Sequence, residues 1–172
     1  DPSIHTMPRL RRALTIHQEI AKARLYVTSR GVYEFYGNGQ RVGDDWLNPG
    51  ITQYNRTHLY QIYDVTPMLK VGENALGAIL GEGWWSGGAT FEGQNWNYFG
   101  DRLSLLAKLT IYYKDGSVEN IVTDPHSWKY SVDGALIYSS LFQGEVYDAR
   151  KDDHNWTTSG YADATWKQAV VI

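Results

Sequence analysis

Cysteine is absent from this 172-residue sequence, which excludes disulfide bonds and thiolate metal sites. The five histidines are dispersed, with no i, i+4 pair, so a zinc centre is not expected. No apolar run approaches the roughly 20 residues that a membrane-spanning helix needs, and no signal peptide is recognisable. The formal net charge of −3, with scattered Lys and Arg, gives no electrostatic reason to expect nucleic acid or an anionic membrane as a partner.

The composition that remains is ordinary for a globular protein, with 42% hydrophobic and 20% charged residues. The length suffices for one domain with a substantial core, and we predict a single domain over residues 1–172. Because the chain opens at DPSIHTMPRLRR, we expect it to be a piece of a longer polypeptide. The lack of cysteine does not decide the compartment. We expect the bacterial periplasm or secretion rather than the cytoplasm.

Alternating side chains predict strands through the first half of the chain. In ARLYVTS, Leu25 and Val27 point to one face and Tyr26 and Thr28 to the other, which is the pattern of a half-buried strand. Asn38-Gly39 suits the positive φ angles of a tight hairpin turn, so VYEFYG and QRVG should pair antiparallel.

The rest of the chain also predicts strands, with one short helical exception. RLSLLAKLTIYY alternates strongly and predicts a core strand, followed by hairpin residues in KDGS and further strands in WKYSV, ALIYSSL and GEVYDAR. Thr66 and Pro67 suit the N-cap and first position of a helical turn over residues 66–69. Roughly eight to ten strands joined by hairpins and longer connections favour an all-β, antiparallel jelly-roll β-sandwich.

Two long loops carry the residues best suited to binding. The first is GDDWLNPG at residues 43–50, and the second runs over residues 81–101 and includes Glu92. A sugar presents an apolar face to an aromatic ring and a polar rim to amides, so we predict sugar-binding residues in the second loop: Trp84, Trp85, Asn95 and Trp96. Carboxylate and amide oxygens are also what a hard cation such as Ca²⁺ prefers.

Each of these residues also has a structural interpretation. Sandwich cores use aromatic residues routinely, so any single Trp can be a packing residue. Of the adjacent pair Trp84 and Trp85, we expect one to point inward and the other outward. Asp44 and Asp45 suit a turn that caps backbone amides, and Asn38 suits the hairpin turn alone.

A catalytic interpretation finds little support in the residues. Glycoside hydrolysis needs two carboxylates on either side of a sugar, and the 19 Asp and Glu make such a pair conceivable. However, no G-x-S-x-G elbow, phosphate loop or H-E-x-x-H motif is present. We therefore predict no catalytic residues in this chain.

From about Arg11 to its end, the sequence resembles the N-terminal β-sandwich domain of bacterial α-L-rhamnosidases. The matching segments occur in the family's order: ARLYVTSRGVYEFYGNGQRVGDD, YDVTPMLKVGEN, AILGEGWWSG, FGDRLSLLAKL, GEVYDAR and TWKQAVV. The resemblance implies a galactose-binding-like jelly roll. It also implies a parent enzyme that removes terminal α-L-rhamnose, with its acid and base on a separate (α/α)₆ barrel.

In some members of this family the sandwich holds L-rhamnose through bound Ca²⁺. Carried over to this sequence, the resemblance implies the cation ligands Asp45, Asn48 and Asn97. Three hypotheses follow: a noncatalytic module that recognises L-rhamnose or rhamnosides, a structural domain that packs against the remaining domains of the parent enzyme, and an autonomous glycoside hydrolase. Fold does not decide between them.

Overall fold

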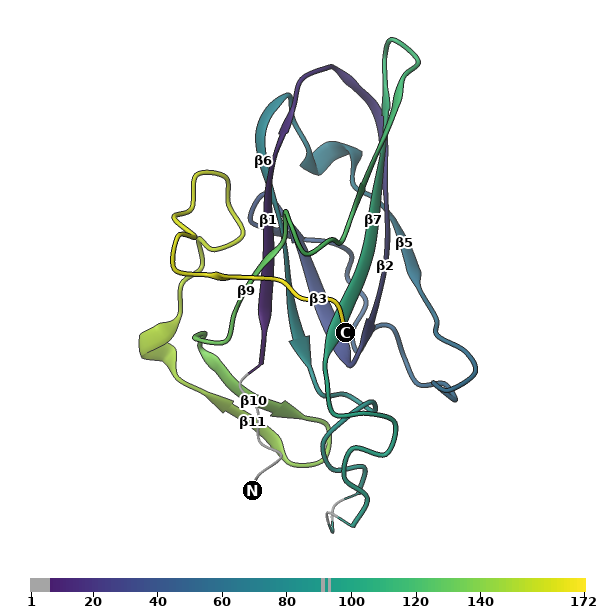
Figure 1. Cartoon of the computed structure of the whole chain (residues 1–172), viewed down its shortest axis with the longest axis vertical. Helices are drawn as coiled ribbons and strands as arrows, with labels where there is room; N and C mark the ends of the chain where they lie inside the picture. Colours follow the sequence, from purple (N-terminus) through teal and green to yellow (C-terminus); the bar gives the residue numbers. More distant parts are fainter. Residues whose placement is uncertain (1–6, 91, 93) are drawn as a thin grey trace.

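The computed structural model describes residues 7–90, 92 and 94–172, and it is built almost entirely of antiparallel strands (Figure 1). The larger sheet has six strands in the order β12-β9-β1-β6-β3-β4: Lys167–Gln168, Lys129–Ser131, Arg9–Ile16, Gly72–Gly81, Val32–Gly37 and Gln40–Arg41. The smaller sheet has four strands in the order β5-β2-β7-β8: Gln61–Asp64, Ile20–Arg30, Ser104–Tyr113 and Val118–Val122. A separate hairpin pairs β10 (Leu136–Ser140) with β11 (Gly144–Tyr147). The prediction of an antiparallel jelly-roll sandwich is confirmed.

The core lies between the two sheets, where the apolar residues of each alternating strand meet. On β2, Leu25 and Val27 are buried and pair in register with Leu109 and Ala107 of β7. The opposite sheet contributes Phe35, Ala78 and Leu80, and Trp128, directly before β9, is buried with them. Burial of alternate positions confirms the period-2 pattern in both strands and supplies the main apolar driving force for folding.

The Asn38-Gly39 turn is confirmed, and it does more than reverse the chain. Both residues have positive φ, and Gly37 pairs with Gln40 across the turn. The Asn38 amide nitrogen donates to Met68 O and to Asn74 Oδ1, each at 2.8 Å, while its oxygen accepts from the Ala75 N–H. The prediction that Asn38 acts only as a turn residue is therefore too narrow, because this side chain joins the hairpin to the start of β6.

The helical turn near Thr66 is present as a 3₁₀ helix, Thr66–Met68, but its cap differs from the prediction. Val65 occupies the N-cap position and makes no side-chain cap. The Thr66 hydroxyl instead donates to Asp64 Oδ1 and accepts from the Ala23 N–H. Thr66 thus connects the turn to β2, and a second 3₁₀ helix covers Ala149–Lys151. No helix in the described residues is both long and apolar enough to cross a membrane.

Candidate functional site

The loop that follows β4 is held in place by Arg41. Its guanidinium donates to Gly43 O at 3.0 Å and also to Asp45 O, so two backbone carbonyls of the loop share one rigid donor group. Further along, the Tyr33 N–H donates to Asn48 O at 3.0 Å. Between these anchors Leu47 has φ 59°, a left-handed conformation that a branched side chain adopts only under constraint. The loop is therefore ordered by defined contacts with the sandwich.

Two of the three predicted cation ligands meet at one phenol. The Tyr63 hydroxyl donates to Asp45 Oδ2 at 3.1 Å and accepts from Asn48 Nδ2 at 2.9 Å. Burial raises the pKa of Tyr63, which keeps the phenol neutral and able to donate. Within the described chain, the other oxygen of each side chain, Asp45 Oδ1 and Asn48 Oδ1, accepts no hydrogen bond. The cluster therefore presents two oriented acceptors to solvent.

Asn97, the third predicted cation ligand, is engaged in the other loop. Its Oδ1 accepts from the Gly87 N–H at 2.8 Å, and its own N–H donates to Gly87 O at 2.9 Å. With φ 53°, Asn97 closes the loop between β6 and β7. Its amide oxygen keeps one lone pair, but among the described residues Asn97 shares no hydrogen-bond partner with Asp45 or Asn48. Among the residues described, no group of three or more His, Cys, Asp or Glu is arranged to hold a metal.

The adjacent tryptophans of the β6–β7 loop divide as expected, one inward and one partly outward. Trp85 is the buried member, only 8% exposed, and its Nε1 donates to Arg102 O at 3.0 Å. The ring packs against Tyr54, Phe99 and the Arg30 guanidinium, whose carbon lies 5.1 Å from the ring centroid. Such an enclosed ring has little face left for a sugar, whereas Trp84 is half-buried.

The other two predicted sugar-binding residues lie in the same loop. Trp96 is half-buried and its backbone bridges to Gly88, while Asn95 is exposed and its carbonyl accepts from the Ala89 N–H at 2.9 Å. The loop is thus a small antiparallel excursion that presents the Asn95 side chain to solvent.

Aromatic contacts join this loop to the connection between β4 and β5. Tyr54 and His58 both contact Trp85. Their ring centroids lie 5.6 and 6.0 Å, respectively, from the centroid of the Trp85 ring. The Tyr54 hydroxyl also donates to Gly50 O at 2.8 Å, so Tyr54 links the loop at residues 43–50 to the β6–β7 loop, a role that the sequence did not indicate. The only signal in the sequence for such contacts is the high number of aromatic residues.

A further aromatic residue in the first loop was not assigned a role from the sequence. Trp46 is 72% exposed, and the Arg41 guanidinium carbon lies 4.3 Å from the centroid of its ring. The signal available in the sequence was its position directly after two aspartates in a loop.

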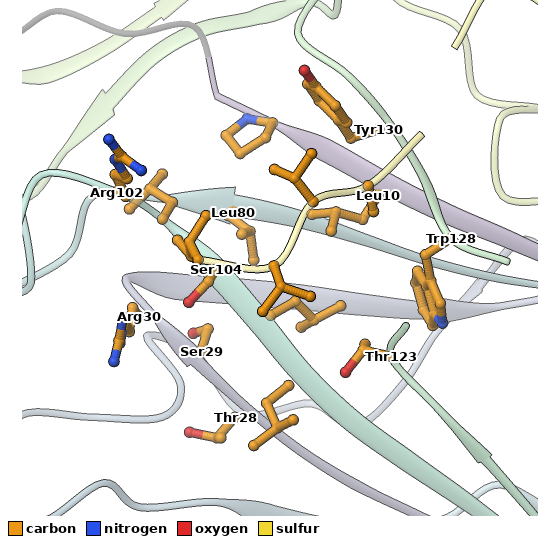
Figure 2. Close-up of a pocket in the computed structure, with 18 of the residues that line it drawn as sticks. Leu10, Thr28, Ser29, Arg30, Leu80, Arg102, Ser104, Thr123, Trp128 and Tyr130 are labelled. Atoms are coloured by element: carbon orange, nitrogen blue, oxygen red, sulfur yellow. The ribbon is translucent and has the colours of Figure 1, made fainter. Parts of the chain in front are cut away.

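A cavity of about 710 Å³ lies between the sheets, and no sequence pattern predicted it (Figure 2). Leu10, Leu80 and Trp128 point into it, while Arg30 and Arg102 lie at one end. The last residues of the chain pass along it, and Val170 and Val171 are 70% and 81% exposed. Because the lining comes from segments far apart in sequence, no local motif marks this cavity.

Glu82, directly after β6, is a buried carboxylate on the cavity wall. It is 2% exposed, and neither carboxylate oxygen has a hydrogen-bond partner within the described residues. Burial raises the pKa of Glu82 to about 7, while the nearby Tyr138 hydroxyl opposes this rise. The carboxylate lies against Gly87, where an added Cβ would come within 1.9 Å of Oε2.

Together, the jelly roll and its loops define the class of galactose-binding-like β-sandwich domains. The family follows from the sequence of this sandwich: the α-L-rhamnosidase N-terminal domain model matches residues 18–172, and the chain belongs to that family.

Relatives and solved structures agree with this assignment. An α-L-rhamnosidase of Streptomyces avermitilis is 41% identical over 150 residues, which are 87% of this chain and 14% of the relative. The crystal structure of an S. avermitilis α-L-rhamnosidase complexed with L-rhamnose matches 96% of this chain and 16% of that one, with 38% identity and a TM-score of 0.90. The native enzyme of Aspergillus terreus matches with 39% identity and a TM-score of 0.91, over 96% of this chain and 19% of that one. This chain thus spans less than a fifth of each of these proteins.

Proposed function

We propose that this chain is a noncatalytic accessory domain of an α-L-rhamnosidase and that it recognises L-rhamnose or rhamnosides. The observation that carries the proposal is the cluster of Asp45, Asn48 and Tyr63. One phenol orients the carboxylate and the amide, and each retains an oxygen that can accept from a sugar hydroxyl. Because these groups are already in place, binding orders few side chains. The relative solved with L-rhamnose supports this choice of sugar.

Calcium forms part of the proposal. The donor set fits a hard cation in kind, because Asp45 and Asn48 offer only oxygens. Calcium takes about 6–8 oxygen ligands, so two protein oxygens leave the remaining positions to other oxygen donors. When bound, the ion would polarise the oxygens around it. The chain's own contribution is to hold the Asp45 and Asn48 oxygens close together through Tyr63.

Calorimetric titration with millimolar L-rhamnose, in calcium and then in chelator, tests the proposal. We expect weak binding that is lost in chelator and restored by calcium. Asp45→Ala or Asn48→Ala should weaken binding by roughly tenfold, since each removes one oriented oxygen. Asp44→Ala is the matched control, because it removes a neighbouring exposed carboxylate and leaves the Tyr63 cluster intact. Absence of heat from wild-type protein in calcium would refute sugar recognition.

A specific observation favours a second candidate, a structural domain that packs against the rest of the parent enzyme. Apolar side chains around the cavity are exposed, including Leu106 at 65% and Val171 at 81%. Exposed apolar side chains gathered around one cavity are typical of interaction sites. Co-purification with the separately expressed remainder of the polypeptide tests it. Leu106→Asp should reduce capture, whereas Tyr147→Asp should not, because Tyr147 is also exposed but does not line the cavity.

A further inference from the structure

Trp46, the tryptophan of the loop at residues 43–50, is exposed and has Arg41 over one face of its ring. Trp46 is 72% exposed, while the Arg41 guanidinium lies 4.3 Å from its ring centroid. An exposed indole offers a large apolar face on which a ligand can stack. Arg41 covers one face of the ring, so the high exposure places the opposite face in solvent.

Arg41 has little freedom to move away from the ring. Its guanidinium donates to the carbonyls of Gly43 and Asp45, and its Nε lies 3.8 Å from a Glu34 carboxylate oxygen. A planar cation fixed in this way keeps the indole in one orientation through a cation–π contact. The ring is therefore a preorganised platform, and a ligand that stacks on it restricts few additional rotamers.

The surroundings of the platform select the kind of ligand. Asp45 precedes Trp46 directly, and the free oxygens of Asp45 and Asn48 are hydrogen-bond acceptors within the same loop. An apolar ring face next to acceptors matches a sugar, which has an apolar face and a rim of hydroxyl donors.

We infer that Trp46 is the stacking residue of the sugar site and that its open face packs against the apolar side of a 6-deoxyhexose, including its methyl group. This inference rests on the proposed function. It replaces stacking on the buried Trp85 ring with stacking on a ring outside the β6–β7 loop. Asp45 and Asn48 bind hydroxyls, while Trp46 contributes selectivity for a methyl group over a hydroxymethyl group.

A comparison of two sugars tests the inference. L-Rhamnose differs from L-mannose only in carrying a methyl in place of a hydroxymethyl group. We expect wild-type protein to prefer L-rhamnose severalfold, since one buried methyl group contributes that much. Trp46→Ala should weaken L-rhamnose binding by roughly tenfold and bring the ratio of the two affinities close to one. Trp46→Phe should retain part of the affinity for L-rhamnose and part of the preference for L-rhamnose over L-mannose.

The controls separate this inference from the proposed function. Tyr147→Ala removes another exposed ring, on the β10–β11 hairpin away from β5 in Figure 1, and should leave both affinities unchanged. If wild-type protein binds L-rhamnose and Trp46→Ala binds it equally well, the stacking role is refuted while the proposed function stands. If wild-type protein does not bind, both are refuted. If Trp46→Ala has a lower melting temperature than wild-type protein, the Trp46→Phe variant is used instead. If Trp46→Phe binds L-rhamnose as tightly as wild type and with the same ratio of affinities for the two sugars, the inference is overturned.

Discussion

Glu82 should make the stability of this domain fall as the pH rises. Its side chain is almost fully buried and has no hydrogen-bond partner within the described residues, so the charged form is disfavoured in the folded state. Its pKa rises from an ordinary value of 4.5 to about 7. Below pH 4.5 the group is protonated in both folded and unfolded chains and adds no pH dependence. Between pH 4.5 and 7 the unfolded chain releases the proton first, and the free energy of unfolding decreases.

The size of the effect follows from the two pKa values. A difference of about 2.5 between folded and unfolded states corresponds to about 3 kcal/mol, fully lost above pH 7. Glu82→Gln keeps the shape and removes the charge. We expect the variant to match wild-type protein near pH 4.5 and to exceed its stability at pH 8 by up to about 3 kcal/mol.

Urea denaturation, followed by tryptophan fluorescence at several pH values, measures this difference. Asp64, Asp124 and other carboxylates have lowered pKa values and act in the opposite direction, so the comparison is between variant and wild type at each pH. Glu73→Gln is the matched control, because Glu73 lies on β6, the strand that precedes Glu82, but is exposed. Parallel stability curves for wild type and Glu82→Gln would refute the reasoning.

Three further outcomes are expected. Trp85→Ala should lower the free energy of unfolding by about 3–5 kcal/mol in thermal or urea melts, because it leaves a cavity in a packed aromatic cluster. Trp46→Ala should have the stability of wild type, and equal stability of the two variants would contradict the assignment of Trp85 as the inward ring. Asn38→Gly keeps the positive φ of the turn but removes three hydrogen bonds, and should lower stability by about 1–3 kcal/mol in urea; no loss would show that the side chain serves the turn alone. The isolated chain should release no sugar from an aryl α-L-rhamnoside above the background rate. Turnover that survives repurification and disappears on changing one carboxylate would place an active site here.

Features that depend only on neighbouring residues could be predicted from the sequence. Alternation at Leu25 and Val27 placed the buried face of β2, and Asn38-Gly39 placed a hairpin, because strand period and positive φ are local properties of the backbone. The order of several such segments was also sufficient to identify the family. The cap at Thr66 was assigned less well, since its hydroxyl contacts β2, which is distant in the chain.

The roles of the residues within the site depend on contacts that form only in the folded protein. Either member of the Trp84-Trp85 pair could have faced inward, and only the packing of Tyr54 and Phe99 selected Trp85. Asp45 and Asn48 share a partner because β5 places Tyr63 beside a loop that ends more than ten residues earlier. The burial of Glu82 and the cavity between the sheets likewise arise from segments that meet only after folding. Burial and hydrogen bonding of this kind depend on contacts that sequence periodicity does not encode.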